Sequence, residues 1–243
     1  MRTLNIAHRG FSGEYPENTM RAFLESVKVG CDGIETDVQM TKDGILVICH
    51  DEIIDRTTNG SGYINDYNYD ELSEFDSGIK YGEEFAGEKI PTLDNLFEFV
   101  KDKDLLINIE LKNNIINYNK MEEKVIEKVY EYNLINNVIL SSFNHYSMVK
   151  VKEIDNKIKT GLLYMSKIYK VHEYAKRCKA DAIHPLYLSV LSEEVVKEVH
   201  NEGISINAWT VDNENDMKKL MGLGIDGIIT NYPNRLNNII EYM

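Results

Sequence analysis

The stretch that decides the fold runs from residue 105 to residue 142, LLINIELKNNIINYNKMEEKVIEKVYEYNLINNVILSS. Residues 105–110 and 138–142 are short apolar runs typical of buried strands, and residues 121–132 between them have the spacing of an amphipathic helix. A strand, a helix and a second strand in this order predict two parallel strands joined by a crossover helix. This unit is the template with which the rest of the chain is compared.

The same alternation extends in both directions and gives eight units of about 30 residues each. Predicted strands lie at 4–7, 33–38, 105–110, 138–142, 160–164, 182–185, 205–210 and 227–230, and predicted helices lie at 18–29, 93–100, 121–132, from about 144, near 172, 192–201, 214–221 and after 230. Eight such units in 243 residues predict an α/β fold, a single (β/α)8 TIM barrel over residues 1–243. An open doubly wound sheet is the alternative, but the chain has neither GxGxxG after its first strand nor GxxxxGK[ST].

One apolar run does not fit the count of eight. Residues 45–49 follow the second strand after a connection too short for a crossover helix, so we predict an antiparallel β-hairpin that turns at Lys42-Asp43-Gly44. A turn centred between Asp43 and Gly44 places Asp37 opposite His50. The hairpin would then return His50 to the rim on which Asp37 lies.

Residues 52–89 are the second irregular segment. They are rich in Asn, Tyr, Gly and Asp, have no sustained period, and are too long for an ordinary loop. We predict a small insertion that caps the mouth of the barrel.

Composition excludes several classes of protein. Hydrophobic residues make up 43% of the chain and charged residues 28%, as in ordinary globular proteins. The net charge of -13 argues against binding to nucleic acid or anionic lipid.

The cysteines, Cys31, Cys49 and Cys178, are odd in number and lack CxxC spacing, so neither a disulfide framework nor a thiolate zinc site is expected. No apolar run approaches the roughly 18 residues of a membrane helix, and the start of the chain shows no signal-peptide core. We expect a cytoplasmic protein without stable membrane insertion, and the sequence leaves its oligomeric state open.

Carboxylates gather where the predicted strands end, the edge at which barrels of this kind hold their active sites. Because side chains alternate along a strand, Glu35 and Asp37 share one face, as do Asn108, Glu110 and Lys112. Three converging carboxylates would repel one another, and oxygen ligands are those that Mg²⁺ or Ca²⁺ prefers. The pattern favours one divalent cation, Mg²⁺ or Ca²⁺, held by Glu35, Asp37 and Glu110, over separate salt bridges in loops.

Two histidines and two cations flank these carboxylates. His8 and His50 suit a general acid and a general base, although either alone could be a hydrogen-bonded structural histidine. Arg9 and Lys112 place positive charge at the same mouth, which suits a phosphate oxyanion, although both could simply pair with the carboxylates.

Taken in order, the motifs resemble the glycerophosphodiester phosphodiesterase family over nearly the whole chain. They are His8-Arg9-Gly10, Glu17-Asn18-Thr19, Gly33-Ile34-Glu35-Thr36-Asp37, His50-Asp51, Asp55-Arg56-Thr57-Thr58-Asn59-Gly60, Pro91-Thr92-Leu93, Asn108-Ile109-Glu110-Leu111-Lys112, Ser141-Ser142-Phe143 and Trp209-Thr210-Val211. The resemblance implies a phospholipase-C-like TIM barrel and a divalent metal. It also implies a small-molecule glycerophosphodiester as substrate, hydrolysed to sn-glycerol 3-phosphate and an alcohol.

The resemblance also implies roles for single residues. Glu35, Asp37 and Glu110 would be metal ligands, His8 and His50 the acid–base pair, and Arg9 and Lys112 the groups that hold phosphate. Asn18 would line the site, whereas its position after Pro16 alone favours a helix N-cap.

The remaining positions have two interpretations each. Phe143 and Trp209 would pack against glycerol, although strand-end aromatic residues also pack in cores. His184 and Asp212 stand where the family often has Asn, and the role of His184 stays open. The functional alternatives are an enzyme for lysophospholipid or phosphoinositide headgroups and a non-catalytic barrel that binds phosphate esters.

Overall fold

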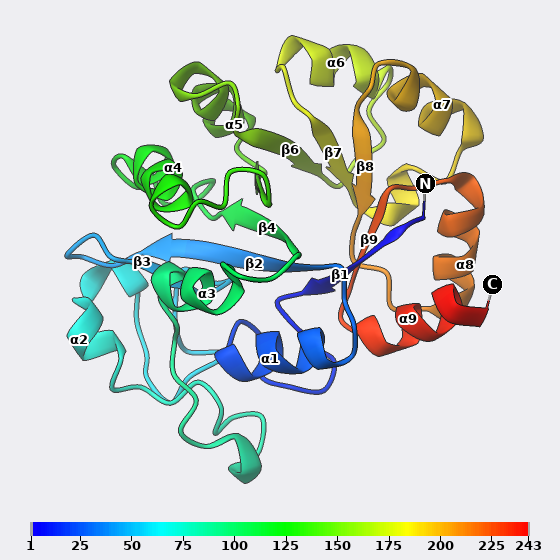
Figure 1. Ribbon diagram of the computed structural model, residues 1–243. Helices are drawn as coiled ribbons and strands as arrows, with labels where there is room; N and C mark the ends of the chain where they lie inside the picture. The colour runs from blue at the N-terminus through cyan, green and yellow to red at the C-terminus, as the bar shows by residue number, and fades with distance from the viewer. Residues whose placement is uncertain (1, 243) are drawn as a thin grey trace.

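The computed structural model describes residues 2–242, and within that range strands alternate with helices along the chain (Figure 1). The strands are β1 (Leu4–His8), β2 (Gly33–Met40), β3 (Leu46–Ile48), β4 (Leu106–Leu111), β5 (Val138–Ser142), β6 (Lys159–Tyr164), β7 (Ala182–Pro185), β8 (Ser205–Ala208) and β9 (Gly227–Thr230). The helices are α1 (Met20–Lys28), α2 (Tyr69–Leu72), α3 (Leu93–Val100), α4 (Met121–Glu131), α5 (His145–Ile154), α6 (Val171–Arg177), α7 (Glu193–Asn201), α8 (Glu214–Leu223) and α9 (Pro233–Tyr242), with short 3₁₀ turns η1 (Ile64–Asp66), η2 (Glu83–Phe85) and η3 (Tyr187–Ser189).

Eight of the strands form a closed parallel barrel. The sheet order is β1-β9-β8-β7-β6-β5-β4-β2-β3, and a further pairing between β1 and β2 closes the ring. Helices α1 and α3 to α9 lie around the outside of this ring (Figure 1). The predicted (β/α)8 barrel is therefore confirmed, with β3 as the one strand outside the closed ring.

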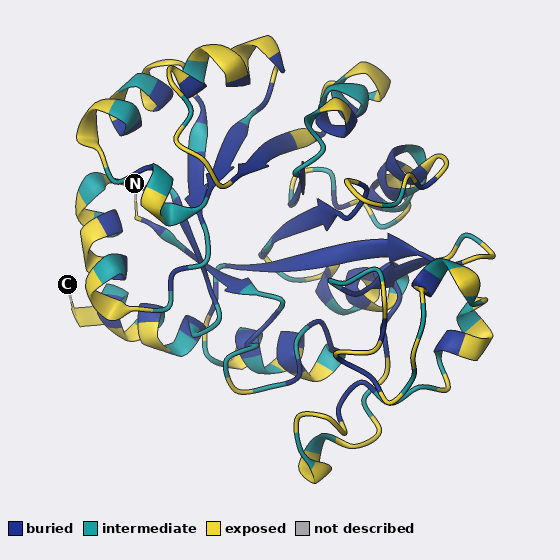
Figure 2. Cartoon of the chain, turned by 180° about the vertical axis from the view of Figure 1, so that it is seen from behind, coloured by how far each residue is buried: buried dark blue, intermediate teal, exposed yellow. Residues whose placement is uncertain are grey.

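The main core lies between the barrel and its helices. On β4, Ile107 and Ile109 belong to this core, whereas Asn108 and Glu110 alternate with them and line a cavity at the barrel mouth. Figure 2 shows the consequence, with dark strands inside and helices that are buried on one face and exposed on the other. Alternation along the strands thus separates the packing residues from the residues that face the barrel interior.

The antiparallel hairpin of β2 and β3 is present, but its predicted register is wrong by one residue. Val38 pairs with Ile48, and the amide of Cys49 donates to the carbonyl of Asp37 at 3.0 Å. The loop has three residues, 42–44, and its last one, Gly44, has a φ of 83°, a left-handed conformation that favours glycine. A three-residue loop shifts the pairing by one position, so Asp37 lies opposite Cys49 and not opposite His50.

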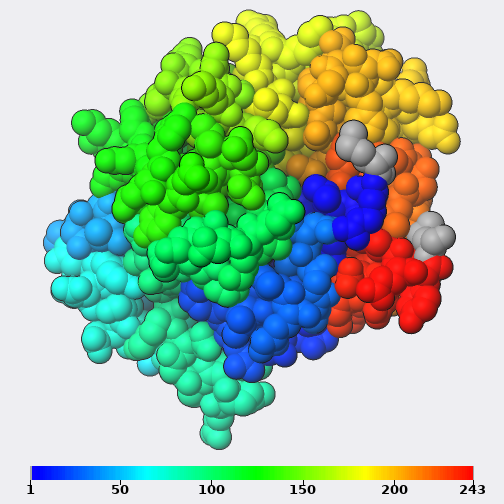
Figure 3. All heavy atoms as spheres, in the orientation of Figure 1, coloured from blue at the N-terminus to red at the C-terminus, as the bar shows by residue number. Residues whose placement is uncertain are grey.

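The inserted segment, residues 52–89, contains η1, α2 and η2 and packs beside the end of β2 (Figure 1). Ile54, Ile64 and Leu72 are buried with Val47 of β3 in a small second core. The part of the segment around η2 projects from the body of the molecule (Figure 3). None of residues 52–89 is among the residues that line the cavity at the barrel mouth.

The helices are short, and one predicted helix start was wrong. Helix α1 begins at Met20, and the hydroxyl of Thr19 accepts the amide of Ala22 at 3.2 Å, so Thr19 and not Asn18 is the N-cap. Between residues 2 and 242, no helix has both the length and the apolar character that crossing a membrane requires.

Candidate active site

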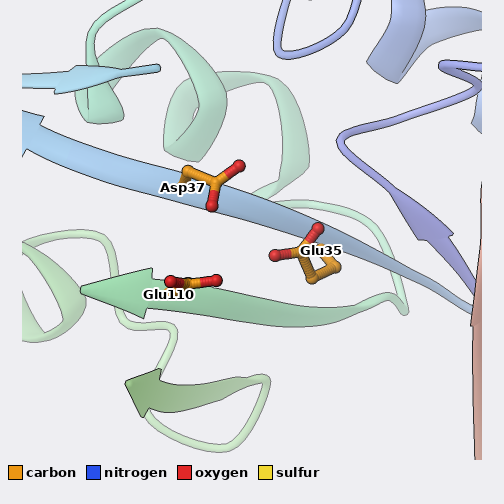
Figure 4. A group of neighbouring side chains, drawn as sticks. All are labelled: Glu35, Asp37 and Glu110. Atoms are coloured by element: carbon orange, nitrogen blue, oxygen red, sulfur yellow. The ribbon is translucent and has the colours of Figure 1, made fainter. Parts of the chain in front are cut away.

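The three predicted carboxylates meet at the C-terminal end of β2 and β4. Parallel pairing places Asp37 beside Glu110 and Glu35 beside Asn108. Glu35, Asp37 and Glu110 point toward one another (Figure 4), and one carboxylate oxygen from each lies within 4.8 Å of the others. Their exposed fractions are only 4%, 1% and 7%, so the strand register gathers three acidic groups away from water.

This cluster is a candidate cation site. Its donors are all carboxylate oxygens, the ligand type that Mg²⁺ and Ca²⁺ prefer. Oδ1 of Asp37 is buried and has no hydrogen-bond partner, and buried polar atoms are rarely left in that state. A cation bound by the three carboxylates would satisfy this oxygen.

Two cations and one amide already contact the carboxylates. The guanidinium Nε of Arg9 lies 3.2 Å from Oδ2 of Asp37, and Nζ of Lys112 lies 2.8 Å from Oε1 of Glu110 and 3.8 Å from Oδ1 of Asp37. The side-chain amide of Asn18 donates to Asp37 at 2.9 Å and accepts the hydroxyl of Thr36 at 2.9 Å. Asn18 and Lys112 therefore contact the carboxylates and do not line the main cavity, whereas Arg9 does both.

The mixture of burial and charge separates the pKa values of the three acids. Burial, with the negative charge of Asp37 nearby, raises the pKa of Glu35 well above its ordinary value and that of Glu110 to about 7. Burial also opposes the ionisation of Asp37, but Arg9 and Lys112 outweigh it and lower the pKa of that carboxyl. Without a further positive charge, the cluster holds protons at neutral pH.

His8 lies at the end of β1, beside Glu35 of β2 in the strand register. Its Nδ1 contacts Oδ1 of Asn231 at 2.6 Å, and its Nε2 lies 3.8 Å from Glu35. Asp212 fixes Asn231 by accepting its side-chain amide at 2.7 Å and its backbone amide at 2.9 Å. Because an amide oxygen can only accept, the proton of neutral His8 lies on Nδ1, and Nε2 is left as the acceptor.

Burial, followed by the charge of Arg9, lowers the pKa of His8 to about 4. The ring is therefore neutral at neutral pH. A neutral ring with an unprotonated Nε2 at the cavity can accept a proton.

His50 follows β3 and lines the same cavity as His8, Glu35 and Glu110. Its backbone carbonyl accepts the side-chain amide of Gln39 at 3.0 Å, and its Nδ1 contacts Oδ1 of Asp51 at 2.5 Å. The sequence thus placed His50 at the correct rim for a wrong reason: the backbone hydrogen bonds to β2 end at Cys49, and the contacts of Gln39 and Asp51 hold His50 there.

The cavity at the barrel mouth measures about 260 Å³ and has two chemically different walls. Its polar wall is formed by His8, Arg9, Glu35, His50, Asn108 and Glu110, and its apolar wall by Phe143, Leu163, Met165, Trp209 and Ile229. This volume is at the lower limit for ligand pockets, roughly 300 Å³, so the cavity fits a small molecule.

Phe143 and Trp209 form the aromatic part of the apolar wall. Their rings meet edge to face, with centroids 5.6 Å apart and planes at 89°. The indole Nε1 of Trp209 donates to the carbonyl oxygen of His184 at 2.8 Å. The polar end of the tryptophan is thus anchored to the backbone, and both rings border the cavity.

His184 lies within the barrel and not on the cavity wall. Its side chain is fully buried, its Nε2 lies 3.0 Å from the amide nitrogen of Asn207, and burial lowers its pKa to about 3. The ring packs against Gly161, where an added Cβ would lie 2.5 Å from Nε2. We assign His184 a supporting place in the core behind Trp209.

Sequence reasoning missed several groups that hold the candidate catalytic residues. Asn231 follows β9, so the rule of examining strand ends would have found it. Asp51, Glu17 and Arg56 stand inside the quoted motifs, but nothing in their spacing indicates that they contact one another. Their contacts depend on how the insertion folds back onto the loop after β1.

Comparison with known proteins gives a consistent result. Residues 8–235 match the model of the Glycerophosphoryl diester phosphodiesterase family. The chain is 48% identical over 241 residues to a glycerophosphodiester phosphodiesterase of Caldanaerobacter subterraneus subsp. tengcongensis, and the match covers 99% of each chain. It is 41% identical to a glycerophosphodiester phosphodiesterase of Bacillus altitudinis, with 98% of each chain covered.

Among solved structures, a phosphodiesterase of Oleispira antarctica in complex with the product sn-glycerol-3-phosphate superposes with a TM-score of 0.88. It is 29% identical to this chain, and the match covers 99% of this chain and 97% of the other. A putative glycerophosphoryl diester phosphodiesterase of Silicibacter pomeroyi gives a TM-score of 0.89 over 100% and 94% of the two chains, and at 23% identity it supports the fold alone.

Proposed function

The chain belongs to the glycerophosphoryl diester phosphodiesterase family, and we propose that it hydrolyses glycerophosphodiesters to sn-glycerol 3-phosphate and an alcohol, with one divalent cation and two histidines. The observation that carries this proposal is the buried cluster of Glu35, Asp37 and Glu110 with Arg9, His8 and His50 around one cavity. A deacylated phospholipid such as glycerophosphocholine or glycerophosphoethanolamine has a size that suits this cavity. The Oleispira antarctica relative with bound sn-glycerol-3-phosphate supports the same choice of product.

Charge balance supports a divalent cation at the three carboxylates. When ionised, Glu35, Asp37 and Glu110 exceed the positive charges of Arg9 and Lys112 by one. A divalent cation reverses this excess to one net positive charge, which matches the single negative charge of a phosphodiester. When bound, such a cation acts as a Lewis acid that polarises a phosphoryl oxygen and lowers the pKa of an attached hydroxyl.

Arg9 and Lys112 would then turn part of their charge toward the substrate. Both side chains pair with the carboxylates. With these carboxylates neutralised, the two side chains would be electrostatically available to phosphate oxygens. The guanidinium of Arg9 lies on the cavity wall and offers N–H groups for this contact.

The two histidines would divide the proton transfers. His8 is neutral and presents Nε2, so it would accept the proton of the nucleophile. His50 lines the same cavity and contacts the carboxylate of Asp51 through Nδ1, so its Nε2 would donate the proton to the departing alcohol. The nucleophile is either water or the 2-hydroxyl of the glycerol unit, and both routes need the same acceptor and donor.

The experiment that tests the function is a turnover assay with glycerophosphocholine, lysophosphatidylcholine and glycerophosphoinositol in the presence of Mg²⁺ or Ca²⁺. Release of sn-glycerol 3-phosphate from glycerophosphocholine, followed by ³¹P NMR, is the expected result. Faster cleavage of the lysolipid, to lysophosphatidic acid and choline, or of the inositol ester would favour the headgroup enzymes. Tight binding of all three compounds without turnover would indicate a non-catalytic barrel.

A further inference from the structure

We infer that Arg56 of the inserted segment is a positioning residue: from outside the cavity it clamps the two carboxylates that orient His50 and Arg9. The inference rests on the proposed function, because it gives Arg56 a role in the chemistry of these two residues. Arg56 itself does not line the cavity.

The guanidinium of Arg56 holds two carboxylates at once. Its Nε donates to Oδ2 of Asp51 at 2.6 Å, while Nη1 and Nη2 donate to Oε2 and Oε1 of Glu17 at 2.8 and 2.7 Å. The paired bonds fix the orientation of Glu17 relative to the guanidinium plane, and the single bond from Nε ties Asp51 to that same plane. Asp51 and Glu17 come from separate parts of the chain, so Arg56 ties the loop after β3 to the loop after β1.

Each of these two carboxylates also contacts a residue of the candidate active site. Oδ1 of Asp51 contacts Nδ1 of His50 at 2.5 Å. Oε1 of Glu17 accepts Nη1 of Arg9 at 2.9 Å, and Nε of Arg9 lies 3.2 Å from Asp37. An unbroken chain of charged contacts therefore runs from His50 through Arg56 to the candidate metal ligand Asp37.

The exposure of Arg56 separates a positioning role from a merely stabilising one. Its side chain is 46% exposed, and ion pairs at exposed positions contribute roughly 0 to 1 kcal/mol to folding. Loss of Arg56 should therefore leave the fold nearly as stable as before. Asp51 would lose a bond that holds its plane, and His50 would lose its fixed orientation.

Lysine cannot replace this arrangement. A lysine ammonium is a point charge on a flexible stem, whereas the planar guanidinium presents several N–H groups in fixed directions. Arg56→Lys keeps the positive charge, but one ammonium group cannot hold both carboxylate oxygens of Glu17 and the carboxylate of Asp51 in fixed positions. The effect of this variant separates geometry from charge.

The first test compares Arg56→Ala and Arg56→Lys with Arg21→Ala. Arg21 is a matched control, since its side chain is 47% exposed and it forms a salt bridge with Glu25 on the same helix, away from the cavity. We expect both Arg56 variants to lower kcat by on the order of 10- to 100-fold, with KM changed less than about threefold, as is typical when a supporting group is lost. Arg21→Ala should leave kcat unchanged, and all melting temperatures should lie within a few degrees.

Chemical rescue with guanidinium tests whether the guanidinium group of Arg56 is itself what supports kcat. Guanidinium ion at millimolar concentration should restore part of kcat to Arg56→Ala and none to Asp51→Asn, which keeps Arg56 and has lost the carboxylate instead. The double variant Arg56→Ala with Asp51→Asn should be little worse than Asp51→Asn alone, because residues that act through one another have non-additive effects. Full activity in both Arg56 variants, or additive effects with Asp51→Asn, would overturn the inference.

A second measurement does not depend on activity. ¹⁵N NMR at a pH at which the His50 ring is neutral should show a single Nδ1–H tautomer in the unaltered protein and a mixture of tautomers in Arg56→Ala. An unchanged ring spectrum in Arg56→Ala would contradict the clamp even in an active enzyme. If the protein does not hydrolyse glycerophosphodiesters, the proposed function fails, and the NMR result still decides whether Arg56 orients His50.

Discussion

The two halves of the barrel wall differ in what they contribute. The half formed by β1, β2 and β4, with the loop after β3, carries the acids, the histidines and Arg9. The half formed by β5 to β9 borders the same cavity with Phe143, Leu163, Met165, Trp209 and Ile229. The charged residues are therefore concentrated on one side of the cavity, and apolar side chains form the surface on the other side.

This division has a physical reason. Buried carboxylates need partners of opposite charge, and Arg9 and Lys112 directly follow β1 and β4, the strands adjacent to β2, within reach of Asp37. An apolar wall opposite them excludes water and strengthens every charge interaction in the cavity. The comparison predicts that substitutions on the polar wall abolish or strongly reduce activity, whereas substitutions on the apolar wall reduce it less.

The largest effect is expected for the carboxylates. Glu35→Gln, Asp37→Asn and Glu110→Gln should each weaken cation binding strongly, because a hard cation then loses one of its three anionic ligands. Calorimetric titration with Mg²⁺ and Ca²⁺ measures the loss. Glu122→Gln is the matched control, since Glu122 is also buried but contacts Ser147 and Lys150 behind the barrel. Equal binding by the three variants and the control would break the assignment of the polar wall.

The histidine variants come next. His8→Ala and His50→Ala should each lower the single-turnover rate by on the order of 10² to 10⁴, the usual range for the loss of a positioned proton-transfer group. Cation binding should survive in both. His200, which pairs with Asp226 away from the cavity, is the control whose change to alanine should not affect the rate. A loss smaller than tenfold for both histidines would remove them from the chemical step.

The apolar wall should give a smaller effect. Phe143→Ala and Trp209→Ala should lower kcat/KM by roughly 10- to 200-fold, which corresponds to about 1–3 kcal/mol of packing against a small substrate. Cation affinity, measured by the same titration, should not change. If either variant lost as much activity as His8→Ala, the contrast between the two walls would not hold.

The smallest effect is the dependence of cation binding on pH. The pKa of Glu110 is raised to about 7, so this acid is protonated below that pH and a cation must displace its proton. The pKa of Glu35 is raised as well, so cation affinity should rise with pH and should fall by up to about tenfold per pH unit for each of the two acids that becomes protonated. Titrations in buffers of different ionisation enthalpy should show proton release near neutral pH. Affinity independent of pH between 6 and 8 would contradict the raised pKa of Glu110.

The barrel could be predicted from the sequence because its signal is repeated. Eight apolar runs separated by amphipathic segments leave few topologies, and alternation along 33–38 and 105–110 indicates which side chains share a face. The convergence of Glu35, Asp37 and Glu110 follows from that alternation together with strand adjacency. Both are regular properties of backbone geometry.

The predictions that were wrong depend on the backbone conformation or contacts of single residues. The left-handed conformation of Gly44 lengthens the hairpin loop to three residues and shifts its register, which a turn motif alone does not specify. Asn18 also adopts a positive φ, 58°, which turns its amide toward Asp37 and leaves the capping position to Thr19. The clamp of Arg56 on Asp51 and Glu17 arises only from tertiary packing, so it has no pattern in the sequence.

The central claim is that the cluster of Glu35, Asp37 and Glu110 holds a divalent cation without which the phosphodiester is not cleaved. It is tested most directly by ³¹P NMR of glycerophosphoethanolamine incubated with protein that has been treated with EDTA and dialysed. We predict no sn-glycerol 3-phosphate until Mg²⁺ or Ca²⁺ is added back, and none after addition to the Glu35→Gln variant. Hydrolysis at the same rate before and after the cation is restored would contradict the claim.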